Sequence, residues 1–212
     1  MSRWPAEPIA LHLGGAGNVL AGTPLAAAAG DWPALAAELA QKLAPGTRLD
    51  VRLVDCWSRY FLFETPVGVS GLRDSRLLLD ARFEALYGQP PADWLLRADW
   101  QAGAPMLACA VPRALEQALA GFRLARLAPA TLRSWNRHCA TLPATGLWCG
   151  ADDGMFNLLY WHEGQLRLVR QQRGDDLDGL LALELARLGA AMPAARFCSG
   201  RAIAGWTALE AA

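Results

Sequence analysis

The glycine-rich turn Gly14–Asn18 is the stretch whose residue types come nearest to a ligand-binding motif. Glycines allow backbone N–H groups to close around an anion, so a turn of this kind can cradle a phosphate. This turn holds no acidic residue, and it holds no lysine or arginine to contact phosphate charge. It also departs from the dinucleotide motif G-x-G-x-x-G, because Leu20 replaces the third glycine. The sequence therefore favours a simple turn between two strands over a nucleotide site.

The histidines and cysteines do not form a metal-ligand pattern. His12, His138 and His162 lie far apart, and no two of them have the spacing of ligands on one helix. His138 and Cys139 together with Cys149 could supply three ligands, but no fourth ligand accompanies them. We therefore expect no metal, no cofactor and no catalytic residue.

The composition is that of a globular protein with balanced charge. The 212 residues are 53% hydrophobic and include 20 basic and 20 acidic residues. A domain that binds duplex nucleic acid usually carries a basic excess, so we expect no nucleic-acid partner. No apolar run approaches the roughly 20 residues of a membrane span, and the N-terminal stretch lacks the apolar core of a signal peptide. The cysteines have no paired spacing, which indicates reduced thiols in a cytoplasmic protein without direct membrane insertion.

The first two thirds of the chain alternate predicted strands with predicted helices. Apolar alternation or short apolar runs predict strands at Ile9–Leu13, Asn18–Ala21, Leu49–Val54, Arg59–Glu64, Trp94–Asp99 and Met106–Val111. Capping residues or prolines ahead of apolar residues at helical spacing predict helices after Asp31, Asp74 or Ser75, Pro112 and Pro129.

The last third gives the clearest pattern. Three successive strands are predicted at Leu147–Gly150, Met155–His162 and Gln165–Gln171. A helix capped by Asp175 or Asp176 and a strand at Ala195–Ser199 follow them. The order is therefore β-β-β-α-β, and the connections between the three strands are short enough to require antiparallel pairing.

This order of elements resembles half of the actin-like ATPase fold, which duplicates such a unit into two lobes around a cleft. Several segments resemble one branch of that fold, the cytoplasmic domain of the type II secretion protein GspL and the type IV pilus protein PilM. The segments that carry this resemblance are DCWSRYFLFETP (Asp55–Pro66), ARFEALYGQPPADWLLR (Ala81–Arg97), MLACAVPRALEQAL (Met106–Leu119) and SWNRHC (Ser134–Cys139).

The resemblance implies a mixed α/β chain with a reduced actin-like, ribonuclease H-like fold, in which two lobes have mixed sheets and flanking helices. We expect residues 1–143 to form the N-terminal and central lobe. Residues 144–212 are expected to form the C-terminal β-β-β-α-β lobe, with the boundary near Pro143–Gly146.

The same resemblance implies that the nucleotide chemistry has been lost. Active members of the actin-like family place an aspartate in the first phosphate loop and another in a second Asp-x-Gly loop, where it orients Mg²⁺ and water. The corresponding turn Gly14–Asn18 has no acid here, and Ser199-Gly200 keeps one glycine of the adenosine loop. Asp152-Asp153-Gly154 could stand for the second loop, but Asp-Gly is also the commonest short hairpin turn, which we favour. We expect a pseudo-ATPase.

A partner-binding surface is predicted at Trp57, Arg59, Tyr60 and Phe61. Aromatic residues and arginine dominate interaction hot spots, so this strand could receive a peptide at an edge or in a groove. The alternative is a core strand, with its aromatic side chains buried on both faces.

The function implied by the resemblance is that of a non-catalytic cytoplasmic scaffold in a type IV pilus or type II secretion inner-membrane platform. Such a scaffold would bind the cytoplasmic segment of a bitopic membrane partner, the role of PilN for PilM, and would lie peripheral to the inner membrane through it. Contact with the assembly ATPase and a homodimer stay open. The alternatives are a nucleotide-binding or phosphotransfer protein of the actin-like superfamily and a module outside pili.

Overall fold

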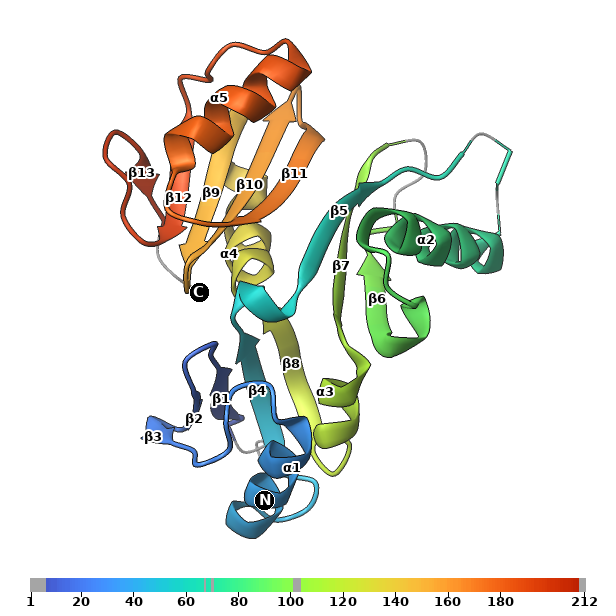
Figure 1. Cartoon of the computed structure of the whole chain (residues 1–212), viewed down its shortest axis with the longest axis vertical. Coiled ribbons are helices and arrows are strands. Elements are labelled where there is room, and N and C mark those ends of the chain that lie inside the picture. The colour runs from blue at the N-terminus through green and yellow to red at the C-terminus, as the bar shows by residue number, and fades with distance from the viewer. Residues whose placement is uncertain (1–6, 67, 70, 101–103, 210–212) are drawn as a thin grey trace, which may run out of the picture.

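Three β-sheets organise the protein. The computed structural model describes residues 7–66, 68–69, 71–100 and 104–209. Within these ranges the strands form two five-stranded sheets and one three-stranded sheet. Figure 1 shows the two five-stranded sheets toward opposite ends of the long axis, with the three-stranded sheet and its helix to one side. Parallel and antiparallel pairs occur together with helices, which confirms the predicted mixed α/β class.

The first five-stranded sheet has the strand order β3-β2-β1-β4-β8. Strands β1, β2 and β3 form an antiparallel meander, whereas β4 is parallel to both β1 and β8. Helix α1 connects β3 to β4, and helix α4 follows β8. The bounds are β1 Ile9–Leu13, β2 Asn18–Leu20, β3 Thr23–Pro24, α1 Trp32–Lys42, β4 Arg48–Leu53, β8 Arg123–Pro129 and α4 Ala130–His138.

The second five-stranded sheet has the order β11-β10-β9-β12-β13. Strands β9, β10 and β11 form the predicted antiparallel meander, and β12 is parallel to β9 and to β13. Helix α5 connects β11 to β12. The bounds are β9 Gly146–Asp152, β10 Met155–His162, β11 Gln165–Arg173, α5 Leu177–Leu188, β12 Arg196–Gly200 and β13 Thr207–Ala208. The β-β-β-α-β order predicted for this part of the chain is confirmed.

The two five-stranded sheets repeat one topology. In each, an antiparallel meander leads through a helix to a strand that is parallel to the first strand of the meander. The last strand, β8 or β13, then adds in parallel beyond it. A parallel return needs a long crossover, which the helices α1 and α5 supply. The duplicated unit expected from the resemblance is therefore present, although no sequence repeat of fixed period reveals it.

The three-stranded sheet is inserted between β4 and β8 of the first unit. Its order is β5-β7-β6, and both pairs are antiparallel. Helix α2 covers it, with Leu79 and Phe83 packed among Phe61, Phe63 and the small side chains of β7. The bounds are β5 Arg59–Phe63, α2 Leu72–Tyr87, β6 Trp94–Ala98, β7 Met106–Pro112 and α3 Arg113–Ala118, with single 3₁₀ turns η1 at Asp55–Trp57, η2 at Pro91–Asp93 and η3 at Cys139–Thr141.

Helix capping explains where two of the helices begin. The Asp31 carboxylate accepts a hydrogen bond from the Ala34 amide at 3.0 Å, and the Asp176 carboxylate accepts one from the Gly179 amide at 2.8 Å. Both side chains satisfy amides that a helix leaves free in its first turn. Helix α2 begins at Leu72, slightly before the predicted cap, because Gly71 is the N-cap residue and Asp74 lies in the first turn.

Strand β8 was missed by the sequence analysis. Its sequence, RLARLAP, mixes arginine with leucine and alanine, and its first four residues are exposed. The strand lies at the edge of its sheet with β4 as its neighbour, so it carries neither a continuous apolar run nor a clean alternation. The helix expected after Pro112 is present and is short, from Arg113 to Ala118.

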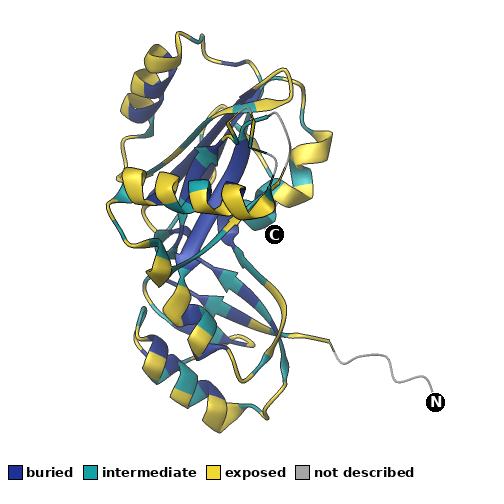
Figure 2. Cartoon of the chain, turned by 90° about the vertical axis from the view of Figure 1, so that its right-hand side faces the viewer, coloured by how far each residue is buried: buried dark blue, intermediate teal, exposed yellow. Residues whose placement is uncertain are grey.

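The main core joins the two five-stranded sheets. Figure 2 shows dark blue, buried strands under helices whose outer faces are exposed. Trp135 of α4, in the first unit, packs edge-on against Trp148 and Trp161 of the second sheet at ring-centroid distances of 5.7 and 5.4 Å. Across the described residues, no helix has the length and apolar character needed to span a membrane. The division into residues 1–143 and 144–212 stays a prediction.

The core of the inserted sheet gives a first prediction. Phe83 is fully buried and lies 5.1 Å from the Tyr87 ring and 5.4 Å from the Trp94 ring. Phe83→Ala should lower the free energy of unfolding by about 3–5 kcal/mol, because it leaves a cavity that the rings cannot fill. Leu77→Ala on the same helix, where the side chain is 59% exposed, should change it by less than about 0.5 kcal/mol. Urea unfolding measures both, and equal losses would contradict this packing.

Candidate functional site

The turns singled out in the sequence meet where the two five-stranded sheets face each other. The Asp153 carboxylate, in the β9–β10 turn, lies against Gly15 in the β1–β2 turn so closely that a Cβ on Gly15 would collide with it. Asp152 lines one small cavity together with Ser199 and Gly200 at the end of β12. The structure therefore brings together three segments that are far apart in the sequence.

The β9–β10 turn is the two-residue hairpin that the sequence favoured. Asp153 and Gly154 both have positive φ, +50° and +70°, and Asp152 pairs with Met155 across the turn. This is the backbone of a type I′ turn, for which Asp-Gly is a preferred sequence. The segment Asp152–Gly154 is therefore a hairpin turn, and it is also the segment that could stand for the second Asp-x-Gly loop of the actin-like fold.

The β1–β2 turn is held by contacts within the protein. The Gly14 amide donates to the Gly17 carbonyl at 2.9 Å and closes the turn. Asn18, which is buried, donates from Nδ2 to the Ala27 carbonyl at 3.0 Å. The indole N–H of Trp57 donates to the Gly14 carbonyl at 3.3 Å. These bonds give the glycine-rich segment a structural role, in agreement with the simple turn predicted for it.

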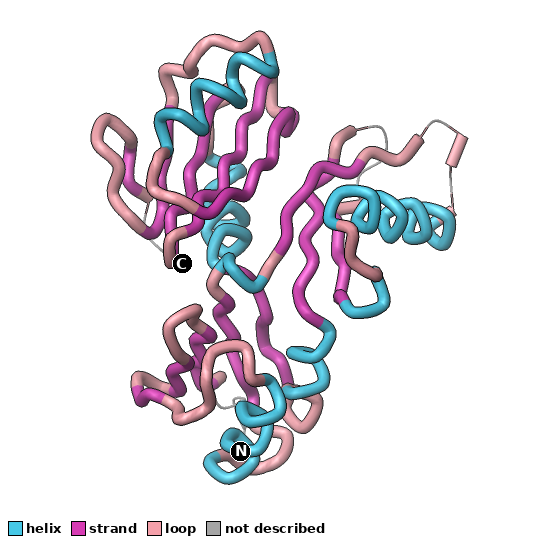
Figure 3. The backbone as a smooth tube through the Cα atoms, in the orientation of Figure 1, coloured by secondary structure: helices cyan, strands magenta, loops and turns pink. Residues whose placement is uncertain are grey.

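A buried carboxylate, Asp55, occupies the centre of the site. Figure 3 shows the short turn η1, which Asp55 begins, between the end of β4 and the start of β5, beside helix α4. Asp55 is 1% exposed. Its carboxylate accepts the Thr131 hydroxyl at 2.8 Å, the Thr131 amide at 3.2 Å and the Tyr60 hydroxyl at 2.5 Å. A buried carboxylate with this many donors has its charge compensated by hydrogen bonds.

Asp55 also caps helix α4 from outside the helix. The residue before this helix is Pro129, which offers no side-chain cap. Thr131, in the first turn, donates its amide to both Asp55 oxygens, each at 3.2 Å. Because the N-terminus of a helix attracts negative charge, it is a natural place for an anion. Here the anion is a carboxylate of the protein itself.

The second sheet reaches the same network through two amide side chains. Asn157 on β10 donates from Nδ2 to the Thr131 hydroxyl at 3.1 Å, and Gln171 on β11 donates from Nε2 to the Asp55 carbonyl at 2.8 Å. Gly150 on β9 lets Thr131 approach, since a Cβ there would collide with the Thr131 hydroxyl. Asp55 is therefore linked to all three sheets.

The space left between the sheets at this point is very small. The cavity lined by Arg52, Asp55, Thr131, Asp152 and Ser199 has a volume of about 10 Å³. That is about the space of one water molecule, whereas pockets for small-molecule ligands usually have about 300–1,000 Å³. In this conformation the side chains of the protein fill the site.

Burial and neighbouring carboxylates set the protonation of the site. Burial raises the pKa of the Asp55 carboxyl above its usual value, while the hydrogen bonds from Tyr60 and Thr131 lower it in part. Burial, and next the Asp153 charge, raise the pKa of the Cys56 thiol to about 11, so Cys56 is a thiol at neutral pH. Burial and Arg52 lower the pKa of His12. Within the described residues, no group of three or more His, Cys, Asp or Glu side chains could hold a metal ion.

The four residues predicted to bind a partner have different surroundings. Tyr60 and Phe61 are each 3% exposed and belong to the core, as in the alternative interpretation of this strand. Trp57 is half-buried, with its ring 5.2 Å from that of Trp32. Arg59 is also half-buried; its guanidinium donates to the Ser58 carbonyl at 2.8 Å and lies 5.4 Å from the centre of the Trp94 ring. Partner binding by these four residues stays a prediction.

Asp55, Thr131, Asn157 and Gln171 were not singled out in the sequence. Asp55 comes soon after an apolar strand, and Thr131 follows a proline that opens a helix, but such polar residues are common in both places. Only the packing of β10 and β11 against the first unit brings the four together.

The fold is that of the actin-like ATPases. No protein-family model matches the sequence, and no curated protein matches it. Among solved structures, a Bacteroides thetaiotaomicron protein with an actin-like ATPase fold and unknown function is similar, with a TM-score of 0.59 and 7% identity over 93% of this chain and 83% of that one.

Two further similar structures match the resemblance seen in the sequence. One is a PilM–PilN type IV pilus biogenesis complex, with a TM-score of 0.61 and 13% identity over 92% of this chain and 81% of the other. The other is the cytoplasmic domain of EpsL, an inner-membrane component of the type II secretion system of Vibrio cholerae, with a TM-score of 0.55 and 17% identity over 95% and 81%. At these identities the likeness establishes the fold, and the predicted similarity to PilM and GspL-type domains is confirmed at that level.

The Asp55 network gives a second prediction. Thr131→Val keeps the shape of the side chain but removes the hydroxyl that donates to Asp55 and accepts from Asn157. Because buried polar groups then lose partners, the free energy of unfolding should fall by about 1–3 kcal/mol. Thr141→Val is the control, since that hydroxyl is exposed and donates to the His138 carbonyl. Chemical denaturation measures both variants, and a Thr131→Val variant as stable as the control would contradict the role given to this network.

A third prediction concerns pH. The folded state raises the pKa of Asp55, so ionisation of this carboxyl costs more in the folded than in the unfolded protein. The stability that Asp55 contributes should be complete below its unfolded pKa of about 3.9 and should decrease as the pH rises through its folded pKa. The difference in unfolding free energy between wild type and Asp55→Asn should therefore shrink from pH 4 toward neutrality. Denaturation across this pH range measures it; a difference that grows with pH would show the opposite sign.

Proposed function

We propose that this protein is a non-catalytic scaffold of a type IV pilus or type II secretion assembly platform. The observation that carries the proposal is the closed site between the two sheets. The N-terminus of α4 is a natural anion site, and the Asp55 carboxylate occupies it. The cavity that remains has a volume of about 10 Å³. A chain that keeps this fold while its own side chains fill the cleft suits a binding role better than a phosphoryl-transfer role.

The similar structures support the biological setting of this proposal. One of them pairs PilM with PilN in pilus biogenesis, and another is the cytoplasmic domain of an inner-membrane secretion component. By analogy of fold, the partner would be the cytoplasmic segment of a PilN-like membrane protein. The scaffold would then lie in the cytoplasm, at the inner membrane, through that partner.

The alternative function is that of a nucleotide-binding or phosphotransfer protein. Asp153 lies against Gly15 and Asp152 lines the same small cavity as Ser199, so the turns that would form such a site are in place. A nucleotide would, however, have to displace Asp153 and separate the two sheets. It would also meet a glycine turn without a basic residue to balance its phosphate charge.

Partner binding can be tested with the membrane partner itself. The cytoplasmic segment of a PilN-like single-span protein from the same organism, made as a labelled peptide, should bind the purified protein, as measured by fluorescence anisotropy. The same peptide in scrambled order is the control. Equal affinity of the two peptides, or no binding of either, would contradict the scaffold function.

Nucleotide binding gives a fourth prediction. Titration of the purified protein with Mg·ATP in an isothermal calorimeter should show no binding heat at micromolar to low millimolar nucleotide, because side chains of the protein fill the site and the glycine turn has no basic residue to contact the phosphates. Phosphate release should equal that of buffer. Micromolar binding that is lost in the Asp152→Ala variant would favour the alternative function.

A further inference from the structure

A groove runs between the inserted sheet and the second five-stranded sheet. Two cavities of about 540 and 240 Å³ lie along it, and both are lined by Leu62 on β5, Arg82 on α2 and Arg167 on β11. The shared lining makes them two sections of one groove. It extends along β5 from Tyr60 to Phe63 and on to Glu64, and along β11 from Gln171 back to Leu166, so the two strands border it in opposite directions.

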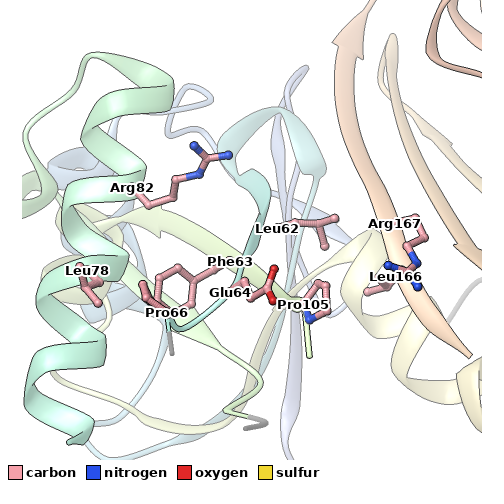
Figure 4. Close-up of a pocket in the computed structure, with 9 residues that line it drawn as sticks. All are labelled: Leu62, Phe63, Glu64, Pro66, Leu78, Arg82, Pro105, Leu166 and Arg167. Atoms are coloured by element: carbon pink, nitrogen blue, oxygen red, sulfur yellow. The ribbon is translucent and has the colours of Figure 1, made fainter. Parts of the chain in front are cut away.

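Both borders of the groove are sheet edges. Strand β5 is the edge of the three-stranded sheet, and β11 is the edge of a five-stranded sheet. Among the described residues no backbone hydrogen bond joins the two strands. The two edges lie too close together for a segment to be inserted between them, so a bound segment would lie over β5, between α2 and β11 (Figure 4).

The charge of the groove is predominantly positive. Figure 4 shows Arg82 on the helix side, Arg167 on the β11 side, and Glu64 between them. Both arginines are exposed, and within the described part of the chain neither makes a hydrogen bond or an ion pair. Arg170 adds a third guanidinium, which lies 3.4 Å from the buried Glu184 carboxylate. The guanidiniums of Arg82 and Arg167 therefore lie on opposite sides of the groove. This arrangement suits a segment that carries carboxylates on both of its sides.

Between these charges the groove offers apolar contacts. Leu62 and Leu166 are half-buried on the two bordering strands, and Leu78 is half-buried on α2. An extended chain points successive side chains to opposite sides, so a segment that alternates acidic and apolar residues can satisfy both features. The two cavities, with volumes of about 540 and 240 Å³, share lining residues, so together they offer an elongated space that suits an extended chain.

We propose that the groove between β5 and β11 binds an extended, acidic segment of a partner protein. Carboxylates of that segment pair with Arg82 and Arg167, and its apolar side chains contact Leu62, Leu78 and Leu166. This proposal rests on the scaffold function and gives the partner-binding surface a chemistry. Strand β5 still borders the binding surface, as predicted from the sequence. Because Tyr60 and Phe61 are buried, however, the contacts with the partner come from Leu62 and from residues of α2 and β11.

The test, a fifth prediction, uses two short labelled peptides, one of alternating valine and glutamate and one of alternating valine and lysine. At low salt the glutamate peptide should bind the full-length protein at least about tenfold more tightly than the lysine peptide. The double variant Arg82→Glu/Arg167→Glu should lose that preference or reverse it. Arg76→Glu, which changes an exposed arginine of the same helix outside the groove, should keep it. Fluorescence anisotropy measures affinity, and thermal melts verify that all variants fold.

The outcomes separate this proposal from the scaffold function. Equal binding of both peptides, or the same loss in Arg76→Glu as in the double variant, overturns the groove assignment. A change in molar mass by light scattering in the double variant would assign the groove to a second copy of the chain and also overturn the proposal.

If the membrane partner's segment binds wild type and double variant equally, the groove assignment is wrong and the scaffold function stands. If that segment does not bind wild type while the glutamate peptide shows the predicted pattern, the scaffold function fails and the groove stands.

Discussion

The buried Asp55 carboxylate needs hydrogen-bond donors, and the donors that it finds come from different parts of the molecule. This need is the constraint on which the arrangement of the three sheets depends. The Asp55 carboxylate caps helix α4, accepts the Tyr60 hydroxyl from the inserted sheet, and is linked through Thr131 to Asn157 on the second sheet. Gln171 reaches the main-chain carbonyl of Asp55 from β11. A buried carboxylate without these donors would be strongly unfavourable, so the three sheets have to meet in one register for the network to close. The relative position of the sheets is therefore fixed by polar contacts as well as by the apolar core.

The same network lies where the fold has an anion-binding geometry. The duplicated topology brings a glycine turn, an aspartate turn and a helix N-terminus to one place between the sheets. At that helix N-terminus Asp55 accepts the amide and the hydroxyl of Thr131, and the Asp153 carboxylate lies against Gly15. In the scaffold proposed above, a partner binds outside this site, beside the inserted sheet.

Strand β5 illustrates how one strand can serve both structure and binding. Phe61 and Phe63 pack under helix α2, and Tyr60 supports Asp55 from the other face. These contacts leave Leu62 and Glu64 for the groove beside β11. In the proposed scaffold the aromatic residues thus hold the receiving strand in place, and the contacts with a partner come from Leu62 and from arginines on neighbouring elements.

The sequence by itself determined the local elements whose signals are local. The Asp31 cap, the cap predicted at Asp175 or Asp176, the Asp153-Gly154 turn and the buried strand β7 depend on residues close in the chain, and each was predicted; the second cap is Asp176. The order of elements, together with the family resemblance, also indicated the duplicated fold. Strand β8 was not predicted because an exposed edge strand needs no apolar pattern. Only the tertiary structure showed that Asp55, Thr131, Asn157 and Gln171 form one network and that Arg82 faces Arg167 across a groove. Their positions depend on the packing of sheets that are far apart in the sequence, and no single-residue pattern records that packing.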